Sequence, residues 1–133
     1  MQMSSMLLNP KLTGDIYSTS EVKTNKKWIN GKPIYRKVFE FSASSFTSQK
    51  QNIAHNIANI DKIIRTECFL YRSDTKESRF LPSIYYGNLT NWAAQVFVRD
   101  TLIKFELGTD MYYNVGLPET TTYVILEYTK TTD

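Results

Sequence analysis

The chain has 133 residues, which suits one domain whose core needs no disulfide or metal to fold. Apolar residues make up 41% and charged residues 22%, as in ordinary globular proteins, while aromatic residues are frequent at 14%. The net charge of +3 comes from scattered basic residues, which argues against nucleic-acid binding. No apolar stretch approaches the roughly 18 residues of a membrane span, so we expect a soluble protein without membrane insertion.

Residues 1–16 form a weakly patterned leader in which Pro10 and Gly14 would interrupt a helix. The leader lacks the basic start and the apolar length of a signal peptide, which favours synthesis in the cytoplasm. It could be a disordered tail, a first edge strand, or an arm that docks on another protein. Residues 17–133 are expected to form one β-sandwich domain.

The pair Asn30-Gly31 gives the strongest local signal. Both residues tolerate a positive φ, and their apolar flanks favour a hairpin, so we predict a type I′ turn. In the following segment, 34–41, Tyr35, Phe39 and Phe41 fall on one face. That period of two predicts a half-buried strand.

The middle of the chain contains a short predicted helix and two predicted strands. Residues 51–59 place isoleucines at helical spacing, which predicts one or two helical turns. Residues 60–71 alternate over the length of a long strand. Residues 72–79 read as a charged turn, and the short strand 80–86 contains Pro82, which favours the edge of a sheet.

The last third adds more short strands. Residues 92–98 and 102–107 predict a hairpin around 99–101, residues 112–115 could pair briefly, and residues 121–128 predict the last strand. About eight strands with regular turns predict an all-β fold. We expect an antiparallel, jelly-roll-like β-sandwich with at most one short helix.

Catalytic and metal-binding residues are sparse. Cys68, the single cysteine, lies in an apolar run and is predicted to be a buried free thiol. His55, the single histidine, is expected to make structural hydrogen bonds. No zinc set, calcium loop or glycine-rich phosphate loop is present, so we expect no metal, no cofactor and no enzyme activity.

Aromatic residues near predicted loops and strand ends are candidates for sugar binding. Neighbouring aromatic residues on a strand face opposite ways, so one ring of each tyrosine pair should be exposed. Exposed rings stack on sugars while amide side chains bond the hydroxyls; core packing or a subunit interface is the alternative explanation. The candidate ligand-binding residues are Tyr85, Tyr86, Trp92, Tyr112 and Tyr113, with Asn88, Asn91 and Asn114 as polar neighbours.

Three segments of the chain form a recognisable pattern: residues 17–21 (YSTSE), residues 28–37 (WINGKPIYRK) and residues 123–133 (YVILEYTKTTD). Together they resemble the terminal β-sandwich module of bacteriophage and prophage virion appendages. Residues 55–57 (HNI) fill a middle position of the same pattern. The resemblance extends over residues 17–133.

The resemblance implies a tip module of a tail fibre, baseplate or head fibre, usually a homotrimer that faces the host surface, and it carries no catalytic motif. Such a protein would be a virion component made in the cytoplasm of a bacterial host. The N-terminal arm, residues 1–16, would then contact other virion proteins, and host surface polysaccharide is a possible ligand. Within the motifs, Arg36 or Lys37 is expected to pair with Glu21 or Glu40.

Two alternatives remain open. The first is a carbohydrate-binding module that acts as a monomer. The second is a hydrolase of surface glycans, which requires two carboxyl groups close together in space. The possible members of such a pair are Glu106, Asp110 and Glu119.

Overall fold

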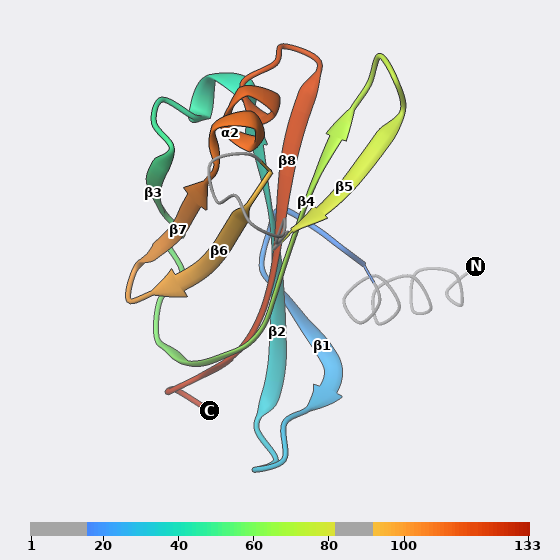
Figure 1. Ribbon diagram of the computed structural model, residues 1–133. Helices are drawn as coiled ribbons and strands as arrows, with labels where there is room; N and C mark the ends of the chain where they lie inside the picture. Colours follow the sequence, from blue (N-terminus) through green and yellow to red (C-terminus); the bar gives the residue numbers. More distant parts are fainter. Residues whose placement is uncertain (1–15, 82–91) are drawn as a thin grey trace, which may run out of the picture. The chain divides into compact units, whose positions relative to one another are not determined.

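The computed structural model describes residues 16–81 and 92–133 (Figure 1). Two antiparallel sheets have the strand orders β1-β2-β8-β4-β5 and β3-β7-β6, which confirms the predicted all-β sandwich. Strand β2 neighbours β8 and β3 neighbours β7, a nested pairing typical of jelly rolls. The strands are β1 (Val22–Lys27), β2 (Pro33–Ser42), β3 (Lys50–Ala54), β4 (Ile60–Arg72), β5 (Glu77–Leu81), β6 (Ala94–Arg99), β7 (Leu102–Leu107) and β8 (Thr120–Lys130), with a 3-10 turn at Ala43–Ser45 and helix α2 at Thr109–Val115.

The chain divides into two compact units. The first unit comprises the chain up to Val38 together with Ala58–Arg65 and Ile125–Asp133, and the second comprises Phe39–Ile57 and Thr66–Val124. Strands β2, β4 and β8 pass from one unit into the other. The N-terminal arm, residues 1–16, lies outside the described residues except for its last residue.

In the first unit, the β1–β2 hairpin closes with a three-residue loop. The Gly31 N–H donates to the carbonyl of Trp28, and the Trp28 N–H donates to the carbonyl of Lys32, each at 2.9 Å. Gly31 has φ of 86°, whereas Asn30 is not among the described residues with positive φ. The predicted type I′ turn is therefore wrong, because a three-residue loop needs a left-handed residue only at its third position.

In the second unit, aromatic rings pack the two sheets against each other. Phe41 of β2 meets Phe105 of β7 edge to face, with ring centroids 5.7 Å apart. Phe46 packs on both rings, with centroids 5.1 Å from Phe105 and 6.3 Å from Phe41. All three are buried, and such edge-to-face pairs stabilise a core by about 0.5–1.5 kcal/mol each beyond burial alone.

The helix predicted over residues 51–59 is wrong. Residues 50–54 form strand β3, which pairs with β7 from Lys50 opposite Glu106 to Ala54 opposite Leu102. An isolated helix of two turns is only marginally stable in water, whereas pairing with β7 gives these residues stable backbone hydrogen bonds. The chain leaves the strand through Asn56, which has φ of 56°.

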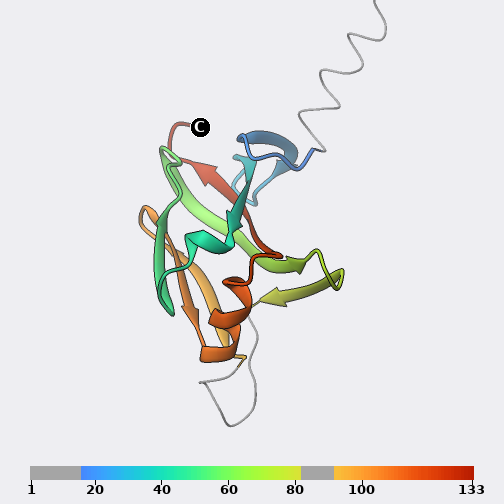
Figure 2. The same ribbon diagram turned by 90° about the horizontal axis from the view of Figure 1, so that it is seen from above.

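The brief extended pairing expected at residues 112–115 is also wrong. These residues belong to α2, which starts after Gly108 and buries Met111, Asn114 and Val115. The helix lies between the end of β7 and the start of β8 in the chain (Figure 2). Burial of one face against the core outweighs the modest helix propensity of this aromatic segment.

Three further predicted elements are confirmed, with shifted ends: the long strand is β4, the hairpin around residue 100 is β6–β7, and the last strand is β8. The charged turn predicted over residues 72–79 is wrong at its ends, because Arg72 ends β4 and residues 77–79 belong to β5, an edge strand. The strand predicted over residues 80–86 shares only residues 80 and 81 with β5, and its residues 82–86 lie outside the described residues. Cys68 is a buried free thiol, and burial raises its pKa to about 12. His55 is 2% exposed, with Nε2 2.8 Å from the carbonyl oxygen of Asp100, which agrees with a structural role.

Candidate functional site

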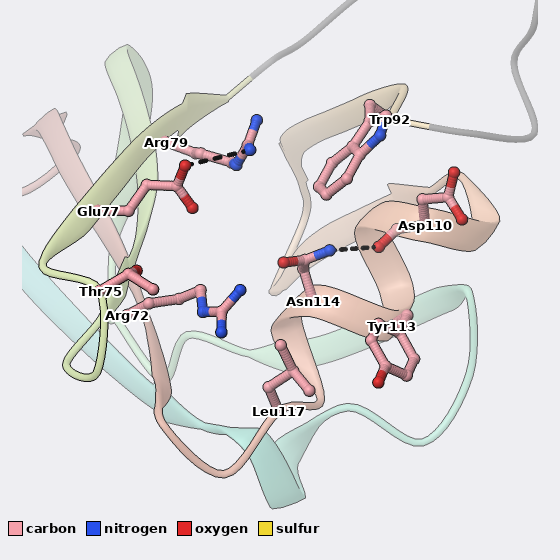
Figure 3. A pocket seen from close by; sticks show the side chains of 9 residues that line it. All are labelled: Arg72, Thr75, Glu77, Arg79, Trp92, Asp110, Tyr113, Asn114 and Leu117. Atoms are coloured by element: carbon pink, nitrogen blue, oxygen red, sulfur yellow. Dashed lines mark hydrogen bonds and ion pairs between the residues drawn. The ribbon is translucent and has the colours of Figure 1, made fainter.

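A pocket of about 510 Å³ opens in the second unit, and every residue that lines it belongs to that unit (Figure 3). Its walls come from the β4–β5 hairpin, from the residues before β6, and from α2 with the loop that follows it. The volume lies in the range of small-molecule sites. The lining residues are Arg72, Thr75, Glu77, Arg79, Trp92, Asp110, Tyr113, Asn114 and Leu117.

Strand β5 places an ion pair on the pocket wall. Glu77 and Arg79 are two residues apart, so they share one face of the strand, while Ser78 and Phe80 on the other face are exposed. A terminal nitrogen of Arg79 lies 3.2 Å from Glu77 Oε2. The Arg79 guanidinium also lies over the ring of Trp92, with its central carbon 4.4 Å from the ring centroid. This cation–π contact places the Arg79 guanidinium on one face of the indole.

A second arginine is held in place by the β4–β5 turn. Arg72 bonds Asp74 with two nitrogens, Nε at 3.2 Å from Oδ1 and a terminal nitrogen at 2.8 Å from Oδ2. This two-pronged hydrogen bonding lowers the pKa of Asp74 and raises the pKa of Arg72. Both groups therefore remain charged near neutral pH, and the Arg72 side chain is fixed at the pocket wall.

Helix α2 supplies the opposite wall. Asn114 is only 6% exposed, and its side-chain N–H donates to the main-chain carbonyl of Asp110 at 2.9 Å. This bond turns the Asn114 amide oxygen toward the side of the pocket that holds the two arginines (Figure 3). Tyr113, the next residue back, is 68% exposed and presents its ring at the rim. The wall thus combines an exposed aromatic ring with an amide oxygen, while the Asp110 carboxylate points away from the arginines (Figure 3).

Three of the predicted sugar-binding residues, Trp92, Tyr113 and Asn114, line this one pocket. Tyr112 is half-buried in α2 and is not a lining residue. Four other predicted residues lie outside the described part of the chain: Tyr85, Tyr86, Asn88 and Asn91. The sequence did not identify the charged lining residues Arg72, Glu77 and Arg79, because it predicts a charged turn over residues 72–79. The pattern that could have identified them is the two-residue spacing of Glu77 and Arg79, which places two opposite charges on one face of a strand.

Of the three carboxylates considered for hydrolysis, only Asp110 lines the pocket. Glu77 is the other carboxylate there, and it is paired with Arg79. Among residues 16–81 and 92–133, no group of three or more potential metal ligands is close enough to hold an ion. No helix in these two segments has the length and apolar character needed to cross a membrane.

In the first unit, a buried carboxylate joins two arginines. Arg36 Nε donates to Glu127 Oε2 at 3.0 Å, and Arg65 Nε lies 3.1 Å from Glu127 Oε1. The Arg36 guanidinium also lies 4.1 Å from the ring centroid of Tyr17. Arg36 thus pairs with Glu127 and not with Glu21 or Glu40, while the alternative pairing through Lys37 stays a prediction.

A second set of contacts in the first unit connects the C-terminal segment to Glu21 and Tyr35. Tyr128 donates to Glu21 at 2.6 Å, and Lys130 lies 2.7 Å from the other oxygen of Glu21. Tyr35 donates to Asp133 at 2.7 Å, which raises the pKa of Tyr35 to about 12. These contacts bring together residues of all three segments that resemble the phage module, and each has a structural role.

Comparisons with protein-family models, with curated proteins and with solved structures find no match for this chain.

Proposed function

We propose that this protein is a non-enzymatic bacteriophage appendage, a fibre or receptor-binding tip that contacts host surface glycans through the pocket of the second unit. The observation that carries the proposal is the convergence of Trp92, Tyr113 and Asn114 in one pocket with two ion pairs. Aromatic faces suit the apolar face of a sugar ring, and the surrounding charged and amide groups suit its hydroxyls.

Support for a role in a virion comes from the three motif segments. Tyr17, Arg36 and Glu127 stand far apart in the sequence, one from each segment, and in the first unit Arg36 contacts both Tyr17 and Glu127. Motif residues that pack in one cluster describe a unit of the folded structure and not only a run of sequence. This packing supports the proposed resemblance between folds. The N-terminal arm is proposed to contact other virion proteins.

A homotrimer is part of the proposal. In the second unit, Phe80 is 69% exposed and packs on Phe69, with ring centroids 5.4 Å apart. Phe69 in turn stacks on Tyr123 at 4.9 Å, so an aromatic row crosses three strands and ends exposed at the edge strand β5. An exposed aromatic row of this kind is suited to a subunit contact. Three pockets per trimer would raise the avidity of a weak site without any new contact.

The test is retention of a multivalent display. Beads coated with the protein are passed over immobilised bacterial surface polysaccharides, and the same is done with Trp92→Ala, Tyr113→Ala and, as a matched control, Tyr112→Phe. We expect the unmodified protein and the control to be retained, and both alanine variants to be lost while their melting temperatures stay within a few degrees. Equal retention of all four proteins would place the binding surface elsewhere, and no retention of any would remove the glycan role.

A monomeric carbohydrate-binding module is the second candidate, because the pocket is contained within the second unit of one chain. A monomeric module would also lose glycan binding when Trp92 is replaced, but its molar mass in solution would be that of a single chain. The two candidates therefore differ in one measurable quantity, the molar mass of the purified protein.

A further inference from the structure

The charged groups of the pocket indicate which kind of sugar it takes. Two guanidinium groups, those of Arg72 and Arg79, line it together with the carboxylate of Glu77. A second carboxylate, that of Asp74, bonds Arg72 with both of its oxygens. Each guanidinium therefore already has a carboxylate partner.

Both arginines already share their charge with a carboxylate. Arg72 uses Nε and one terminal nitrogen on Asp74, which is the two-pronged geometry that carboxylate recognition needs. Arg79 gives a terminal nitrogen to Glu77 and lies against the Trp92 ring, and its other N–H groups can still donate. An acidic sugar would bring its own negative charge close to Asp74 or Glu77, and this repulsion costs free energy.

A neutral sugar fits the same groups without displacing any of them. Each sugar hydroxyl both donates and accepts a hydrogen bond, and the pair of Glu77 and Arg79 offers an acceptor beside a donor. Two adjacent hydroxyls can therefore bridge this pair, one toward the carboxylate and one toward the guanidinium. The amide oxygen of Asn114, on the facing wall, can accept from a further hydroxyl (Figure 3).

We propose that the pocket takes an uncharged hexose, held through two adjacent hydroxyls on the Glu77–Arg79 ion pair, in preference to an acidic sugar. This inference rests on the proposed glycan-binding function and assigns its ligand class. The exposed ring of Tyr113 supplies the apolar contact, since one face of Trp92 is already covered by Arg79. Glu77 is then a specificity-determining residue, because replacing its charge changes both the acceptor and the charge balance.

The experiment uses full-length protein on beads and two sets of probes. The uncharged set is mannan, dextran and galactan, and the acidic set is alginate and polygalacturonate. We expect at least one uncharged polysaccharide to retain the beads, with retention on both acidic polymers at least about tenfold lower, in line with the loss of one charged hydrogen bond. Stronger retention on the acidic polymers would overturn the inference and leave the proposed function standing. No retention on any polymer would overturn both.

Variants of the Glu77–Arg79 ion pair sharpen the result. Glu77→Gln should weaken retention on the uncharged polymer by about tenfold, because it removes a charged acceptor. Arg79→Gln removes the donor of the same ion pair and should weaken it by a similar factor, and Glu40→Gln, an exposed carboxylate of β2, should leave it unchanged. Circular dichroism confirms that each variant is folded, and Arg79→Gln replaces Glu77→Gln as the test if the latter unfolds. Retention of the folded pocket variants equal to that of Glu40→Gln would overturn the inference.

Discussion

Arg36 and Glu127, separated by 91 residues in the chain, form a buried ion pair with Nε and Oε2 3.0 Å apart. The side chains are 6% and 10% exposed, so both charges have left water and depend on each other. One residue belongs to the WINGKPIYRK segment and the other to the C-terminal segment. The pair therefore joins two of the segments on which the resemblance to a phage module rests.

Removing one charge of this pair should destabilise the protein strongly. Glu127→Gln leaves the Arg36 guanidinium buried without its carboxylate, and we expect the free energy of unfolding to fall by about 3–5 kcal/mol. Lys62→Met is the control; Lys62 is 59% exposed beside Asp61 and should change stability by less than about 1 kcal/mol. Urea unfolding measures the free energy of unfolding of both variants.

The double variant Arg36→Met/Glu127→Met should recover part of that loss, because apolar side chains of similar size need no partner. The recovery should be incomplete, since Arg65 loses the same carboxylate. A Glu127→Gln protein as stable as the Lys62→Met control would contradict the description of this pair as buried and interdependent.

The hairpin loop offers a test of the corrected turn. Gly31→Ala should cost about 1–2 kcal/mol, because alanine must adopt φ of 86°. The space around Gly31 is open, so this cost is conformational and not steric. Asn30→Val should cost less, since it loses only the hydrogen bond from the Lys32 N–H to the Asn30 side chain. Thermal unfolding that ranks Asn30→Val as the more harmful change would restore the type I′ turn.

The stability of the first unit should fall at high pH through Tyr35. Its hydrogen bond to Asp133 raises the pKa of Tyr35 from 10.0 to about 12, so the protonated phenol is favoured in the folded state. The stabilisation of the folded state by this hydrogen bond is complete below pH 10 and is lost as the pH rises toward 12. Melting temperatures of the unmodified protein and of Tyr35→Phe should therefore converge over that interval. A constant difference would contradict the assigned hydrogen bond.

The trimer is tested by molar mass. Light scattering should give three times the chain mass of 15.5 kDa. Phe80→Lys should lower the mass without unfolding the protein, because Phe80 is 69% exposed. Ile29→Lys is the matched control: Ile29 is 91% exposed in the hairpin loop, outside the aromatic row, and its replacement should leave the mass unchanged. A monomer at micromolar concentration would favour the carbohydrate-binding module.

The strands could be predicted where the alternation of side chains is long. Residues 34–41 and 60–71 each gave a clear period of two, and both segments are strands. The short elements could not be predicted in this way. The isoleucines at 53, 57 and 60 happen to have helical spacing, yet pairing with β7 decides the structure of residues 50–54. The seven residues of α2 are too few to show a period.

The pocket was only partly predictable for a related reason. Aromatic and amide residues identified Trp92, Tyr113 and Asn114 through their chemistry. The charged wall depends on the β4–β5 turn, which folds Glu77 and Arg79 back beside Arg72. These charges become neighbours of the aromatic residues only in the folded chain, and no local pattern contains that information.

The most direct test of the proposed glycan site is the indole signal of Trp92 in two-dimensional NMR. The chain has two tryptophans, Trp92 in the pocket and Trp28 in the hairpin of the first unit, so one protein contains both probe and control. Oligosaccharides of the retained uncharged polymer are added up to several times the ~1 mM dissociation constant expected for a weak single site. The account predicts that the Trp92 indole signal shifts and saturates while the Trp28 signal stays in place. A Trp92 signal that does not move, or a shift at Trp28 alone, would contradict it.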